Sequence, residues 1–390
     1  GAGVADGQHL PTKIGPDANV KWKAAVPPGF SSPVVVGDKL VLTAFDGGKL
    51  VTIALSATDG TELWRKDSGA TKIEAFHKTE GSPAASTPAS DGERVVVYFG
   101  SCGLICYDLS GNEQWRYDLP VAETNNDFGS GTSPVIADGK VILFRDLAKN
   151  SVLVALDAKT GSKAWEVKRD GFPTSYGSPC VWATPQGKQV VCPGNKKLVA
   201  YDLASGAEVW SAAVSPSVPC TTPVVADGTL VVAAWSPGQA DFKLPTFDEL
   251  LKEADKNGNG AFDKAESAGH FLKDFFDNND PNKDGVITRA EWDDAQKFLA
   301  AGKNLAVAIT PGGKGDVTDT NVAWKVTKGL PYVPSPVVYR GVMYTVNMRG
   351  RLSAHDAKTG KEVYLDEAVS LNGGVYASPL AADGHLYLCG

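Results

Sequence analysis

The chain has 390 residues, of which 43% are hydrophobic, and it carries a formal net charge of −7. This composition can build a large core, and without a basic cluster it does not fit a nucleic-acid-binding protein. No stretch approaches 18 uninterrupted apolar residues, so we expect no membrane-spanning helix. Residues 1–7 do not form a signal peptide and are typical of a mature or engineered end, which leaves a removed signal open.

A strand, a glycine turn and an aromatic residue recur along the chain. The clearest copies run from Ala54 to Trp64 and from Ala155 to Trp165. Further copies end at Trp115, Trp210 and Tyr364, and more divergent ones end at Trp22 and Trp324. They alternate with a hairpin that opens on Ser-Pro or Thr-Pro. These hairpins begin at Ser32, Thr87, Ser133, Ser178, Thr222, Ser335 and Ser378.

Together the two halves predict a four-stranded antiparallel blade. One blade cannot bury both faces, so the fold class we expect is an all-β propeller with seven visible units. We expect the turn glycine to take a positive φ and the tryptophan to lie flat between blades against a small alanine of a neighbouring copy. The Asp residues of these turns, such as Asp157, are interpreted as structural.

Two twelve-residue segments, 255–266 and 280–291, match the calcium loop of an EF-hand, which supplies oxygen ligands at alternate positions around a sharp turn. Gly260 and Gly285 hold the turn position, while Phe262 and Ile287 should pair as a short bridge. The first loop offers Asp255, Asn257, Asn259, the carbonyl of Ala261, Asp263 through water, and Glu266. The second offers Asp280, Asn282, Asp284, the carbonyl of Val286, Thr288 through water, and Glu291.

The residues around these loops predict short helices. A capping box at Thr246–Glu249 opens the first, residues 270–277 supply the second, and an exit helix follows the second loop around Trp292. We therefore expect a small all-α EF-hand pair at 237–303 that binds two Ca²⁺ ions. The propeller then comprises residues 1–236 and 304–390.

The repeat Ala-x-Asp-x-x-Thr-Gly-x-x-x-Trp resembles that of the pyrroloquinoline-quinone (PQQ) type β-propellers. These include quinoprotein dehydrogenases and the propeller lipoprotein of the outer-membrane barrel-assembly machinery. The segments 220–223 and 234–238 are similar to those of secreted bacterial PQQ-repeat proteins with an EF-hand insertion. The resemblance implies a secreted or periplasmic protein and favours eight blades. Seven blades remain open if the strand around Trp22 completes the last one.

The resemblance to quinoprotein dehydrogenases implies an adjacent Cys-Cys pair, which this chain lacks, so we do not expect PQQ as a cofactor. The five histidines have no metal-ligand spacing, and we assign no catalytic residue. Cys180 and Cys192 would face each other across a hairpin, and Cys102 and Cys106 across a turn. Each pair could form a disulfide or remain free.

The loops before the Ser-Pro hairpins should meet at the mouth of the central funnel, where aromatic and polar groups make a binding surface. We expect a non-enzymatic scaffold that binds a protein or polymer partner there. The alternative is a quinoprotein-like oxidoreductase, or another enzyme that uses the same mouth. The candidate mouth residues are Phe30, His77, Asp127, Tyr176, Tyr332 and Tyr376.

Overall fold

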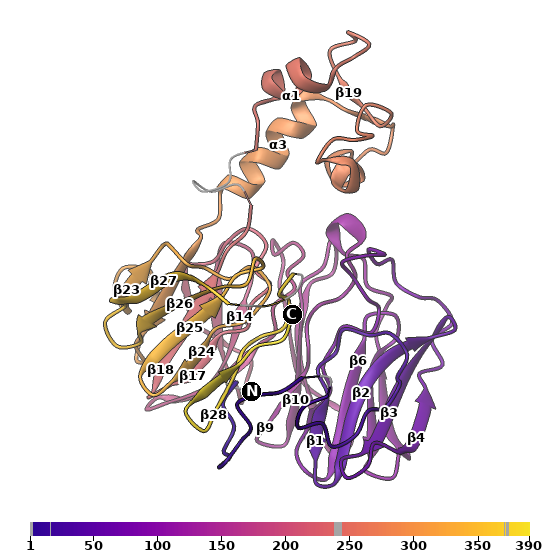
Figure 1. Ribbon diagram of the computed structural model, residues 1–390, viewed down its shortest axis with the longest axis vertical. Helices are drawn as coiled ribbons and strands as arrows, with labels where there is room; N and C mark the ends of the chain where they lie inside the picture. The colour runs from indigo at the N-terminus through magenta and orange to yellow at the C-terminus, as the bar shows by residue number, and fades with distance from the viewer. Residues whose placement is uncertain (1–2, 16, 238–243, 370, 372–373) are drawn as a thin grey trace.

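The computed structural model describes residues 3–15, 17–237, 244–369, 371 and 374–390 (Figure 1). Within them, one two-stranded sheet pairs residues 262–263 with 286–287. Of the other seven sheets, six are each built on four antiparallel strands, and one has two. We call them blades one to seven in chain order. None of the helices in these ranges is long and apolar enough to cross a membrane.

The blades follow the sequence repeat. The first three consist of β1–β4 (Val34–Val36, Lys39–Asp46, Lys49–Ser56, Glu62–Asp67), β5–β8 (Ala89–Ser90, Arg94–Phe99, Gly103–Asp108, Glu113–Asp118) and β9–β12 (Val135–Ala137, Lys140–Arg145, Val152–Asp157, Lys163–Lys168). Blades four and five consist of β13–β16 (Cys180–Thr184, Gly187–Pro193, Leu198–Asp202, Glu208–Ala212) and of β17, β18, β21 and β23 (Val224–Ala226, Thr229–Ala234, Leu305–Ile309, Val322–Val326). Blades six and seven consist of β24–β27 (Val337–Tyr339, Val342–Val346, Arg351–Asp356, Glu362–Ala368) and of β28 and β29 (Leu380–Ala382, His385–Tyr387).

The first strands of consecutive blades touch one another in the order β1, β5, β9, β13, β17, β24 and β28. This is the radial arrangement of a β-propeller, with the first strand of each blade innermost. The second and third strands are buried on both faces because a neighbouring blade covers each face, as β6 and β7 show. The N-terminal segment runs between the seventh blade and the first. Val4 bridges Ala381, the Tyr387 hydroxyl donates to Pro11 O at 3.2 Å, and the Trp22 indole donates to Ala57 O at 3.1 Å.

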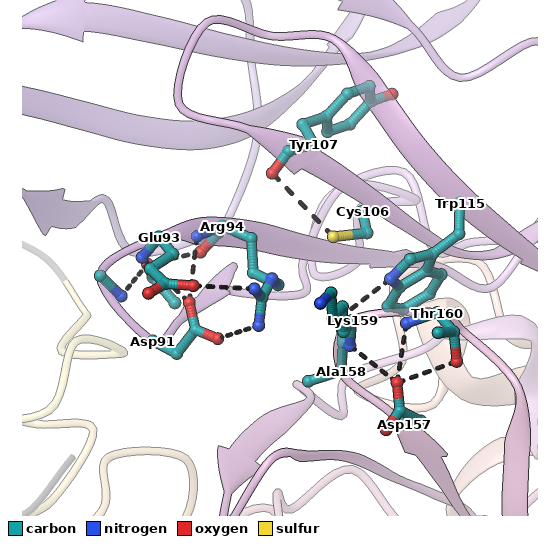
Figure 2. A network of polar contacts seen from close by, with 12 residues as sticks. Asp91, Glu93, Arg94, Cys106, Tyr107, Trp115, Asp157, Ala158, Lys159 and Thr160 are labelled. Carbon is teal, nitrogen blue, oxygen red and sulfur yellow. Dashed lines mark hydrogen bonds and ion pairs between the residues drawn. The ribbon is translucent and has the colours of Figure 1, made fainter.

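Four repeat tryptophans, Trp64, Trp115, Trp165 and Trp324, hydrogen-bond to the blade that follows their own. The Trp115 indole N–H donates to Ala158 O at 3.0 Å, beside a turn that Asp157 holds through Lys159 N and Thr160 N (Figure 2). Trp115 shares a core cluster with Ala158 of the next copy, and its ring also lies against the turn glycine, because a Cβ at Gly161 would come within 2.7 Å of Trp115. Glycine is needed twice here, for its φ of +72° and for its missing side chain.

Blade four departs from the repeat. The turn between β21 and β23 is extended, and its short strand β22 (Gly315–Asp316) pairs parallel with β16 as a fifth strand. Trp210 therefore lies opposite Gly315, and its indole donates to Gln189 Oε1 at 2.8 Å within its own blade.

The chain leaves the propeller after β18 and returns at β21, and the helices between them project from the sheets (Figure 1). The predicted capping box at Thr246 is present, and Phe262 pairs with Ile287 as predicted. Thr288 forms a second capping box that was not predicted from the sequence. The elements of this segment are α1 (Phe247–Ala254), β19 (Phe262–Asp263), the 3-10 turn η2 (Lys273–Phe275), α2 (Phe276–Asn279), β20 (Val286–Ile287) and α3 (Arg289–Ala300).

Two sequence predictions were wrong in detail. The helix expected over 270–277 is the turn η2 followed by the short α2, because Gly269 takes a φ of +88° and the chain then makes i→i+3 hydrogen bonds. The hairpin register places Cys180 opposite Val191, so Cys192 lies one position away. A one-residue offset turns a side chain to the other face of the sheet, and both thiols are free.

Candidate functional site: the propeller mouth and two cation loops

The loops from each outer strand to the next inner strand share one end of the propeller. Because the four strands of a blade alternate in direction, the connection between the second and third strands lies at that same end. The helical segment between β18 and β21 is such a connection. The helices and the predicted mouth therefore lie on the same face of the molecule.

Three loop residues form an aromatic chain at the mouth. The His77 ring stacks on Phe128 with centroids 5.1 Å apart, and Phe128 meets Tyr176 edge-on at 6.1 Å. The Tyr176 hydroxyl donates to Asn125 O at 3.1 Å. Burial raises the pKa of this hydroxyl above its ordinary value, so Tyr176 is a neutral donor.

Tyr332 connects the mouth to the root of the helical segment. Its ring meets Trp235, the residue after β18, edge-on at 5.6 Å. Burial raises the pKa of Tyr332 well above its ordinary value. Nearby groups that can become negative raise it further, and they come from four other loops: Cys220, Tyr176, Glu80 and Tyr376.

Phe30, Asp127 and Tyr376 are placed differently. Asp127 lies in a 3-10 turn, η1 (Asn125–Asp127), with a φ of +51° that is strained for a residue with a side chain. Tyr376 is 47% exposed and within electrostatic reach of Tyr332. Phe30 is 58% exposed, and no ring contact joins it to the other mouth aromatics in the described residues. The sequence reasoning missed Phe128, Trp235 and Glu80, because none of them occupies a repeat position.

The two candidate cation loops have the same backbone conformation. In the first, Asp255 accepts hydrogen bonds from Gly258 N at 2.6 Å and Gly260 N at 3.0 Å. In the second, Asp280 accepts from Asp284 N at 3.2 Å and Gly285 N at 2.9 Å. The fourth positions take positive φ angles of 72° at Gly258 and 61° at Lys283.

The last acid of each loop folds back over it. Glu266 accepts from Lys256 N at 2.7 Å and from Asp263 N at 3.0 Å, and Glu291 accepts from Thr288 N at 2.9 Å. Glu266 is 8% exposed. Asp280 is 2% exposed, so two predicted ligands, one first and one last, are buried, and neither forms an ion pair within the part of the chain that the structure describes.

The donor set fits a hard divalent cation. All twelve predicted ligand positions offer oxygen, which suits Ca²⁺ and not a thiolate-seeking metal. Ion pairs of the segment join Lys264 to Asp277, Arg289 to Asp248, Lys297 to Asp294 and His270 to Glu253, and no loop acid forms one within the described residues. In those same residues, no three His, Cys, Asp or Glu side chains converge as a ready metal cluster. Instead, the loop carboxylates turn toward backbone N–H groups.

Two buried polar networks lie between the blades. Asp146 and Arg169, both with fully buried side chains, pair through Nε–Oδ1 at 2.6 Å and Nη2–Oδ2 at 2.9 Å. Glu74 accepts from Ser130 Oγ at 2.7 Å, and burial raises its pKa to about 7. Arg145 donates to Tyr98 OH at 2.9 Å in the same network.

With this geometry in hand, we compared the chain with known proteins. A family model described as outer membrane protein assembly factor BamB matches residues 12–148 and 149–250. The chain belongs to this family. The family model matches twice, over two consecutive stretches, as expected for a chain built from repeated blades.

Individual relatives cover less of the chain. The assembly factor BamB of Alkalilimnicola ehrlichii is 29% identical over 189 residues, 45% of this chain and 43% of the relative. BamB of Yersinia pestis is 25% identical over 194 residues, 47% of each chain. The matched region thus spans about half the length of these curated relatives. Among solved structures, a europium-containing methanol dehydrogenase has a TM-score of 0.56 at 13% identity, over 90% of this chain and 70% of that chain. This likeness shows the fold alone.

Proposed function

We propose that this chain is a calcium-binding propeller scaffold that holds a protein or polymer partner at its mouth. The observation that carries the proposal is the set of ring contacts between separate loops, in which His77 stacks on Phe128, Phe128 meets Tyr176, and Tyr332 meets Trp235. Tyrosines offer large contact area at low entropic cost together with a polar tip, which suits a binding surface. The proposal divides the chain into a propeller at 1–236 and 304–390 and an EF-hand pair at 237–303, of which 238–243 lie outside the described residues.

Calcium is the second part of the proposal. The oxygen-only donors, the matching backbone turns of the two loops and the buried Asp280 and Glu266 support one Ca²⁺ ion in each loop. Each ion would stabilise the fold by about 2.7 kcal/mol when free calcium is a hundred times the dissociation constant.

The family supports the proposed partner and compartment. The relatives are named as outer membrane protein assembly factors, so we propose a secreted or periplasmic location and a protein partner in the cell envelope. A large propeller face with exposed side chains at its rim, such as Tyr376, suits docking without catalysis.

The calcium site is tested by calorimetric titration of the chelator-treated chain beside thermal melts. We expect one ion per loop and a higher melting temperature with calcium. Glu266→Gln together with Glu291→Gln should remove both effects, whereas Asp294→Asn, an exposed acid outside the loops, should keep them. An intact chain that binds no calcium would overturn this part of the proposal.

The mouth is tested by site-specific photo-crosslinking in an envelope extract. A crosslinking residue at Tyr376 should capture a discrete partner, and excess unlabelled chain should compete it away. Gln186, in the exposed turn at the opposite end of a blade, is the matched control position. A Tyr332→Ala chain should compete poorly. Equal capture from both positions, or full competition by Tyr332→Ala, would refute the mouth as the docking site.

A further inference from the structure

The helical segment meets the propeller at two separate places. At its root, Ser236 N donates to Asn304 Oδ1 at 2.9 Å, and Asn304 Nδ2 donates to Ser236 O at 2.6 Å. These two hydrogen bonds hold the two ends of the segment together. The Ser217 hydroxyl donates to Phe298 O at 2.6 Å, near the end of α3. At the other place, α2 touches η1 in the loop between blades two and three.

The root contact holds α3 firmly. Ser217 is fully buried, Lys303 N donates to Ser215 O at 2.9 Å, and the Lys196 ammonium lies 5.6 Å from the centre of the Phe298 ring. A Cβ at Gly302 would come within 2.2 Å of Ser217 N, so the backbones are in close contact. Helix α3 is therefore fixed to blades four and five.

The far contact leads directly to the mouth. Asn125 of η1 receives the Tyr176 hydroxyl on its carbonyl, and its N–H donates to Thr174 Oγ1 at 2.8 Å. At the root, Trp235 packs on Tyr332. The segment thus abuts the mouth from two sides, beside two of the tyrosines that form the proposed docking surface.

The second cation loop lies between the fixed helix and the one that touches the mouth. Asp280, its first predicted ligand, directly follows α2, and Glu291, its last, lies in the first turn of α3. Phe276 of α2 is 1% exposed and packs on Phe262 of the inter-loop bridge, with centroids 5.8 Å apart. An ion that draws Asp280 and Glu291 together fixes the angle between α2 and α3.

We infer that a cation in the 280–291 loop presses α2 against η1 and so sets the opening of the propeller mouth. This inference rests on the proposed function, since it makes calcium the regulator of the proposed docking surface. Without the ion, α2 is held to α3 by its own packing alone and can swing away from η1. The mouth then changes its shape beside Tyr176.

The test measures two distances by pulsed electron spin resonance in the full chain, with Cys389→Ser to remove the exposed thiol. Labels at Lys149 and Lys273 report on the gap between the blade-three loop and η2, and labels at Lys149 and Lys297 report on α3 as a reference. We expect the first pair to lose its longer-distance population when calcium replaces chelator, while the reference pair stays unchanged. Glu291→Gln should retain the longer population in calcium.

Glu266→Gln is the matched control, because the first loop does not join α2 to α3. It should keep the calcium response of the first pair, at a higher calcium concentration. If calorimetry shows calcium binding and the first pair does not respond, the coupling is wrong and the calcium site stands. If no calcium binds, both the calcium proposal and this inference fail.

Discussion

The backbone N–H of Thr87, at the start of blade two, donates to the hydroxyl of Ser133, at the start of blade three, at 2.9 Å. The same bond recurs around the ring. It joins Ser32 to Thr87, Ser133 to Ser178, Thr222 to Ser335 and Ser335 to Ser378. Five of the Ser-Pro or Thr-Pro dipeptides thus tie one blade to the previous one through their hydroxyls, those of Thr87, Ser133, Ser178, Ser335 and Ser378. The proline holds the preceding residue in the extended conformation.

Removing one of these hydroxyls should weaken the contact between two neighbouring blades. Ser133→Ala leaves the Thr87 N–H without its acceptor, and we expect a loss of about 1–2 kcal/mol in unfolding free energy. Ser133→Thr is the matched control, since a threonine hydroxyl accepts the equivalent bond at Thr87. Urea unfolding measures both. Equal stability of the alanine and threonine variants would refute the role of the hydroxyl.

The contact between tryptophan and glycine makes a second prediction. Gly161 and Gly139 have nearly the same φ, +72° and +70°, but only Gly161 lies against a ring, that of Trp115. Gly139→Ala should lower the unfolding free energy by about 1–2 kcal/mol, the cost of a positive φ for a residue with a side chain. Gly161→Ala should cost about 1–3 kcal/mol more, because the indole must move. Unfolding followed by tryptophan fluorescence checks the difference, and equal losses would contradict it.

The features that recur in every blade could be predicted from the sequence, whereas the departures from the repeat could not. Blade strands, turn glycines and the Phe262–Ile287 pair were predictable, because alternation and turn chemistry are local. The extra strand β22 was not, since it depends on where the long turn before Asn321 lies in space.

The mouth was predictable only in outline. The strand count alone places these loops on one face, so Tyr176 and Tyr332 could be proposed from the sequence. The partners Phe128 and Trp235 come from loop conformation and from the root of the inserted segment, which carry no periodic signal. The pairing of η1 with α2 joins residues far apart in the chain, and no local pattern encodes it.

The buried pair of Asp146 and Arg169 gives a third prediction. Asp146→Ala leaves the guanidinium buried between Phe172 and Phe144 without its counter-charge, and we expect a loss of about 3–5 kcal/mol. Asp146→Leu combined with Arg169→Met should recover much of that loss, because no unpaired charge remains. A double-mutant cycle by urea unfolding measures this. A double variant as unstable as Asp146→Ala would show that the pair itself supplies the stability.

Glu74 should make stability depend on pH. Its carboxyl is 2% exposed, and its Oε1 has no hydrogen-bond partner among the described residues. Burial raises the folded pKa to about 7, against 4.5 as the ordinary value. The folded chain therefore keeps its proton where the unfolded chain loses it, and unfolding free energy falls as pH rises between these values. The total loss is at most about 3 kcal/mol, and it levels off above the folded pKa.

Glu74→Gln should remove this dependence, because the amide stays neutral at every pH. We expect the variant to equal the wild type near pH 5 and to be the more stable of the two near pH 8, by about 1–3 kcal/mol. Glu80→Gln, an exposed acid of the same loop, is the matched control and should keep the wild-type pH profile. Urea unfolding with chelator present excludes calcium release from the measurement. A pH profile that Glu74→Gln leaves unchanged would mean that another buried group sets it.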